Sequence, residues 1–109
     1  MTPDEFRALA LSFANVKCVS VFGVTEFWIN GVSFASLASP DPGMAILKLS
    51  REDQAALMVA ARVVFSPAPG GAGGQGVTQM RLVNAKAAHA RRALKAAYDK
   101  AARSLPRGG

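Results

Sequence analysis

Alternating hydrophobic and polar positions across residues 22–50 predict three strands joined by two turns. The first turn is Asn30-Gly31, because both residues tolerate the positive φ that a type I′ hairpin turn requires. The second covers residues 40–43, where proline fixes φ and glycine releases it. Two more strands are expected at residues 17–22 and 77–82, which are β-branched or alternating.

Three other segments carry apolar residues at helical spacing. The first, at residues 3–14, opens with Thr2, Pro3 and Glu5, which form a capping-box signal. The second, at residues 51–61, follows Ser50 as its N-cap. The third, at residues 85–104, carries one apolar stripe: Ala87, Ala90, Leu94, Tyr98, Ala101 and Leu105.

The predicted order is α-β-β-β-β-α-β-α within a single domain of residues 1–109, whose last five residues are expected to fray. This order predicts an α+β fold, a mostly antiparallel sheet with helices packed on one face. Residues 66–76 are expected to be a long irregular loop, either functional or mobile.

If the helices cover the side of the sheet that holds Phe27 and Ile29, strand alternation assigns a second set of side chains to the uncovered face. That set is Trp28, Phe34, Ile46, Lys48, Val77, Gln79 and Arg81. It contains two aromatic and two basic residues. A register shift of one residue would invert the assignment.

Positive charge is concentrated at the carboxyl end of the chain. The net charge is +6, yet eight basic residues and only Asp99 as an acid lie between Arg81 and the end. This asymmetry favours an anionic partner such as nucleic acid. The other interpretation is a helix kept soluble by its charges.

Composition narrows the class of protein. Half of the 109 residues are hydrophobic, which predicts a folded core, and no stretch reaches the roughly 20 apolar residues of a membrane span. Cys18 is the only cysteine, which suggests a reducing compartment, and the acidic start of the chain disfavours a signal peptide. We expect a cytoplasmic protein without a membrane partner.

No residue pattern points to catalysis. His89 is the only histidine, and neither a nucleophile–base pair nor a set of metal ligands can be assembled around it. Residues 71–76 match GxGxxG, but they lack the preceding strand and following helix that hold a pyrophosphate. We therefore expect no enzyme, no catalytic residues, no metal and no cofactor, with His89 as a solvated helix residue.

Four segments carry a family resemblance: TPDEFRALAL at residues 2–11, FGVTEFWINGVSFASL at 22–37, AILKLSREDQAAL at 45–57 and FSPAPGGAGGQGVTQMRL at 65–82. In this order, and followed by the alanine-rich helix, they resemble the MmcQ/YjbR family of small bacterial proteins. The resemblance implies a double-wing, frataxin-like fold and, by fold analogy alone, DNA binding.

The sequence thus predicts a domain that binds nucleic acid through its basic C-terminal helix and its uncovered sheet face. The candidate residues are Trp28, Phe34, Lys48, Arg51, Arg81, Lys86, Arg91, Arg92 and Lys95. The alternative is a protein-interaction module or a homodimer that uses the Trp28/Phe34 face. The expected oligomeric state is a monomer or a weak homodimer. A small-molecule site under residues 70–76 is a third possibility.

Overall fold

A six-stranded antiparallel sheet in the order β1-β2-β3-β4-β6-β5 forms the centre of the computed structural model, which describes residues 1–37 and 43–104. The strands are β1 (Lys17–Val21), β2 (Val24–Ile29), β3 (Val32–Leu37), β4 (Met44–Lys48), β5 (Phe65–Pro67) and β6 (Val77–Arg81). The helices are α1 (Pro3–Leu11), α2 (Arg51–Ala60) and α3 (Ala87–Arg103), with 3-10 turns η1 (Gly70–Gln75) and η2 (Leu82–Asn84).

The predicted α+β class is confirmed, with one strand more than expected. Residues 65–67 pair with β6 as the edge strand β5, although the loop was expected to begin at Ser66. The turn predicted at residues 40–43 and the fraying predicted for residues 105–109 lie mostly or wholly outside the described residues.

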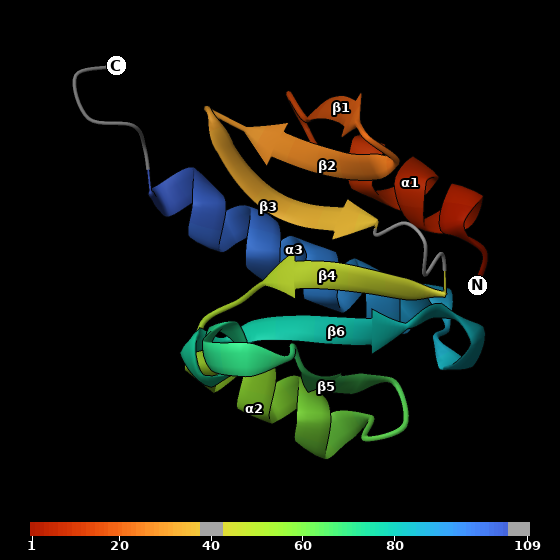
Figure 1. Ribbon diagram of the computed structural model, residues 1–109, viewed down its shortest axis with the longest axis vertical. Helices are drawn as coiled ribbons and strands as arrows, with labels where there is room; N and C mark the ends of the chain where they lie inside the picture. Colours follow the sequence, from red (N-terminus) through yellow and green to blue (C-terminus); the bar gives the residue numbers. More distant parts are fainter. Residues whose placement is uncertain (38–42, 105–109) are drawn as a thin grey trace.

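The helices leave one face of the sheet uncovered (Figure 1). Helices α1 and α3 lie behind the strands in this view, and α2 lies next to β5 at the lower end of the molecule. The core between sheet and helices is built from aromatic and aliphatic side chains of both layers, including Phe6, Phe27, Phe34, Leu47, Met80 and Leu94. The sheet therefore has an inner face under α1 and α3 and an outer face toward solvent.

The predicted caps are present at the first two helices. The Thr2 hydroxyl accepts the Glu5 backbone N–H at 3.1 Å, and the Thr2 N–H donates to the Glu5 carboxylate at 2.8 Å. The hydrogen bond from the Thr2 backbone N–H, and after it the Thr2 side chain, lower the pKa of the Glu5 carboxylate below its ordinary value of 4.5, because both favour its charged form. At α2, the Ser50 hydroxyl accepts the Asp53 N–H at 3.1 Å.

A β-bulge between β2 and β3 overturns one sequence prediction. Phe27 pairs with Ala35 and Trp28 with Ser33, so Phe34 is the additional residue on β3. In a β-bulge, two residues of one strand lie opposite a single residue of the other strand. Beyond the bulge, the side chains of the longer strand therefore point to the faces opposite to those that simple alternation predicts. Phe34 is therefore 0% exposed in the core and does not share the outer face with Trp28.

The glycine-rich segment is ordered rather than an irregular loop. The Ala68 N–H donates to the Val77 carbonyl at 2.9 Å, which extends the pairing of β5 with β6. The Gln54 amide of α2 donates to the Gly73 carbonyl at 3.0 Å and to the Val77 carbonyl at 3.1 Å. These hydrogen bonds hold residues 70–75 against α2 and β6. The structure therefore shows a packed segment and not a free flap.

Candidate nucleic-acid interface

The predicted site residues divide between two opposite sides of the molecule. Trp28, Lys48 and Arg81 belong to the outer face of the sheet, where Lys48 pairs with Val77 and Arg81 with Met44. Lys86, Arg91, Arg92 and Lys95 lie on or beside α3, which packs against the inner face (Figure 1), and Arg51 lies at the start of α2. Phe34 is buried between these layers, so the aromatic and basic groups do not form one continuous surface.

The register confirms the other predicted outer-face positions. Ile46 pairs with Gln79 and alternates with the buried Ala45 and Leu47, as expected for a strand covered on one side. On β6, Val77 and Gln79 alternate in the same way with buried Thr78 and Met80. The outer face is thus mixed, with apolar, amide and basic side chains.

Trp28 is the one that remains of the two aromatic residues predicted for the outer face. It is partly buried, and its indole Nε1 is enclosed without a hydrogen-bond partner among the described residues. It lines a cavity of about 370 Å³ together with Lys17 and Asn30. A single, partly covered ring offers less stacking area than the two exposed rings that the sequence predicts.

The solvent side of α3 carries the densest set of exposed cations. Ala90, Ala93, Leu94, Ala97 and Ala101 form the buried side, and their small volume allows the helix to lie close to the sheet. The opposite and flanking positions hold four exposed basic residues: Arg91, Arg92, Lys95 and Arg103. From Arg92 to Arg103 the helix rises roughly 16 Å at 1.5 Å per residue.

Carboxylates balance part of this charge. Lys95 and Asp99 form an ion pair with an Nζ–Oδ2 distance of 2.7 Å, and no other ion pair occurs within residues 1–37 and 43–104. A groove of about 420 Å³ between α2 and α3 is lined by Arg92, Lys95 and Arg103 together with Asp53 and Asp99. The groove keeps one net positive charge, while Arg91 lies outside it.

The remaining predicted bases flank this surface. Lys86 is the exposed residue that precedes α3. Arg51 is exposed in the first turn of α2 and does not line the groove. The structure therefore brings together Arg92 and Lys95 and adds Arg103, which was counted among the C-terminal basic residues but was not one of the candidate site residues.

His89 differs from its prediction as a solvated helix residue. Its Nδ1 accepts the Lys86 backbone N–H at 3.1 Å, and its ring packs edge-on against Phe65 with centroids 6.3 Å apart. Nδ1 must be unprotonated to accept this bond. His89 therefore satisfies one of the free N–H groups at the start of α3, a structural role.

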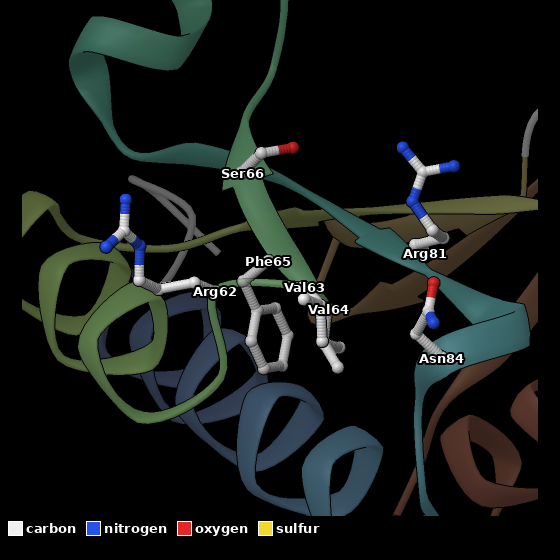
Figure 2. Close-up of a pocket in the computed structure, with 7 residues that line it drawn as sticks. All are labelled: Arg62, Val63, Val64, Phe65, Ser66, Arg81 and Asn84. Atoms are coloured by element: carbon white, nitrogen blue, oxygen red, sulfur yellow. The ribbon is translucent and has the colours of Figure 1, made fainter.

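A second basic site, which the sequence did not indicate, lies at the β5 end of the outer face (Figure 2). Arg62, Ser66, Arg81 and Asn84 surround a cavity of about 340 Å³. Ser66 and Arg81 point to one side of the strands, while Phe65 points to the other side, toward α3. Arg62 and Arg81 line one cavity from the two sides of β5 because β5 pairs with β6. A strand of three residues leaves no recognisable period in a sequence.

Exposed apolar side chains collect at the β1–β2 hairpin. Phe22 is 100% exposed at the turn, with φ of 52°, and it follows the exposed Val19 and Val21 of the edge strand β1. The sequence predicts an exposed apolar surface around Trp28 and Phe34. In the structure, exposed apolar side chains lie instead at the edge of the sheet, at Val19, Val21 and Phe22.

Two other kinds of feature are absent from the described part of the chain. It contains no group of three or more histidine, cysteine, aspartate or glutamate residues placed to hold a metal ion. None of its helices has the length and apolar character needed to cross a membrane. Comparison with family models, curated proteins and solved structures gives no match for this chain.

Proposed function

We propose that this protein binds double-stranded nucleic acid through the solvent side of α3, by contacts with phosphates rather than with bases. The observation that carries the proposal is the set of four exposed basic residues on this helix, Arg91, Arg92, Lys95 and Arg103, of which only Lys95 has an acidic partner in the described structure. The resemblance to the MmcQ/YjbR family agrees with it but is a weaker reason, because fold analogy does not establish function.

The chemistry of the surface favours a duplex over a single strand. Single strands are held largely by stacking on aromatic rings, and the solvent side of α3 has none. Between the basic residues lie Ala88, Ala96 and Ala102, whose methyl groups allow a helix to approach the duplex closely. The major groove of B-DNA is wide enough to admit such a helix.

The proposed role is binding without catalysis, in the cytoplasm. The single Cys18 forms no disulfide, which agrees with a reducing compartment. Positive charge that attracts phosphates at long range also raises association rates.

A salt titration tests the proposal. With about four phosphate contacts, the logarithm of the affinity for a 20-base-pair duplex should fall with a slope of roughly −3.6 against the logarithm of salt concentration. Between 50 and 200 mM salt this means a loss on the order of 100-fold, measurable by fluorescence anisotropy. Affinity that does not change with salt, or no binding at 50 mM, would contradict the proposal.

We infer self-association along β1 as a second candidate function, supported by the exposed Phe22 beside an edge strand. Edge strands present unpaired backbone groups on which another strand can add. Sedimentation should show dimers at high protein concentration for the wild type and monomers for Phe22→Ser. The matched control is Val83→Ser, which changes an exposed valine elsewhere and should leave the dimer intact. A wild type that stays monomeric would exclude this function.

A further inference from the structure

We propose that the cavity between Arg62 and Arg81 is a binding site for a phosphate monoester with an apolar or aromatic body. This site lies on the outer face of the sheet, and α3 lies on the other side of the strands (Figure 2). The inference goes beyond the proposed nucleic-acid binding and does not depend on it.

The backbone holds the two arginines in place from different elements. Arg62 follows the end of α2, where the Ala61 N–H donates to the Leu57 carbonyl at 2.9 Å and the Phe65 N–H donates to the Ala61 carbonyl at 3.0 Å. Arg81 ends β6, and its own N–H donates to the Val64 carbonyl at 2.8 Å. The short turn between α2 and β5 therefore fixes both Cα positions around one cavity.

Nothing in the described structure compensates these two charges. Neither arginine takes part in an ion pair within the described residues, and no carboxylate lines the cavity. Both guanidinium groups line the cavity from the two sides of β5, so an anion bound there would be attracted by two uncompensated positive charges. Guanidinium groups bind phosphate oxygens through paired, charge-assisted hydrogen bonds.

The other polar residues of the cavity suit a phosphate better than a carboxylate. The Ser66 hydroxyl and the Asn84 amide add hydrogen-bond donors to those of the arginines. A phosphate monoester carries about two negative charges and three acceptor oxygens, whereas a carboxylate carries one charge and two oxygens. Two arginines and two neutral donors therefore match the two charges and three acceptor oxygens of a phosphate monoester.

An adjoining cavity provides room for the body of the ligand. It measures about 650 Å³, shares Arg62, Phe65 and Ser66 with the first cavity, and is lined on its far side by Met58, Val59 and Pro67. Val59 is 84% exposed, so an apolar wall stands open to solvent beside the arginines. Both cavities lie within the range of about 300–1,000 Å³ typical of small-molecule sites.

Binding of phenyl phosphate, followed by calorimetry and by shifts of backbone amide signals, tests the site. We expect saturable shifts at Ser66 and Arg81, and inorganic phosphate should bind about tenfold more weakly because it lacks the ring. Arg62→Gln and Arg81→Gln should each weaken phenyl phosphate about tenfold or more, since each removes charged hydrogen bonds. Val59→Asn should reduce the advantage of phenyl phosphate over inorganic phosphate.

Three controls make the result decisive. Arg7→Gln removes the same charge from an exposed position on α1 and should leave binding unchanged. Benzoate should bind far more weakly than phenyl phosphate, and the double variant of Arg62 and Arg81 should retain the affinity for duplex DNA. The inference is overturned if phenyl phosphate does not saturate, if benzoate binds equally well, or if Arg7→Gln weakens binding as much as Arg62→Gln.

Discussion

Replacement of Phe34 by alanine is expected to lower the free energy of unfolding by about 3–5 kcal/mol. The side chain is fully buried, and its ring meets Tyr98 of α3 edge-on with centroids 5.7 Å apart. Truncation removes this contact and leaves a cavity between β3 and α3 that the surrounding backbone can fill only in part. Urea unfolding followed by circular dichroism measures the change.

The matched control for this variant is Phe22→Ala. It makes the same chemical change at a side chain that is 100% exposed, so it should alter stability by no more than about 0.5 kcal/mol. If side chains alternated along β3 without a bulge, Phe34 would lie on the outer face. Phe34→Ala and Phe22→Ala would then both change the free energy of unfolding only slightly. A loss below about 1 kcal/mol for Phe34→Ala would therefore contradict the bulge between β2 and β3.

Gly76→Ala is expected to have the second large effect, a loss of about 2–4 kcal/mol. Gly76 has φ of 109°, a conformation that alanine adopts only with strain. A Cβ atom at this position would also collide with the carbonyl oxygen of Leu49 and the backbone of Ser50, which cannot move without displacing the start of α2. Thermal unfolding of the variant would report the loss.

Gly74→Ala provides the comparison for Gly76→Ala in the same segment. A Cβ atom at Gly74 would meet no neighbouring atom within 4 Å, and the position needs no positive φ. Alanine there should therefore change stability by no more than about 0.5 kcal/mol in either direction. Equal effects at the two glycines would mean that residues 70–76 are not packed against Leu49 as the structure has them.

The local parts of the fold were predictable because their signals are local. Thr2 and Ser50 cap helices through contacts with residues only three positions away. Asn30-Gly31 fixes the β2–β3 turn through its own φ values, which are positive at both residues. Each of these features depends on a few neighbouring residues, so a single sequence is enough to locate them.

The bulge and β5 were not predictable for the opposite reason. In the sequence, Phe34 fits the alternating pattern of its strand. Only the pairing of Phe27 with Ala35 and of Trp28 with Ser33 shows that Phe34 is an additional residue on β3. β5 has three residues, too few for a period, and its partner β6 lies beyond the glycine-rich segment. Arg62 was missed with it, because the cavity it lines exists only when β5 joins the sheet.

The separation of the predicted site follows from the layers of the fold. A helix that buries Ala90 and Leu94 against the inner face of a sheet must direct its other side away from that sheet. Arg91 and Arg92 therefore point away from the face that holds Trp28 and Arg81. Lys48 lies at the edge of that face, where it shares a cavity with Lys100 and Ser104 of α3. The charge asymmetry of the sequence indicated the basic helix correctly, but it carried no information about which sheet face the helix covers.

The most direct test of the central claim, that the solvent side of α3 binds duplex phosphates, compares two triple variants with equal loss of charge. One carries Arg91→Gln, Arg92→Gln and Arg103→Gln on α3, and the other carries Lys17→Gln, Arg62→Gln and Arg81→Gln on the outer sheet face. We predict that the α3 variant makes the salt slope of duplex binding shallower by about three, while the sheet variant leaves it unchanged. An unchanged slope for the α3 variant, or an equal change in both, would contradict the claim.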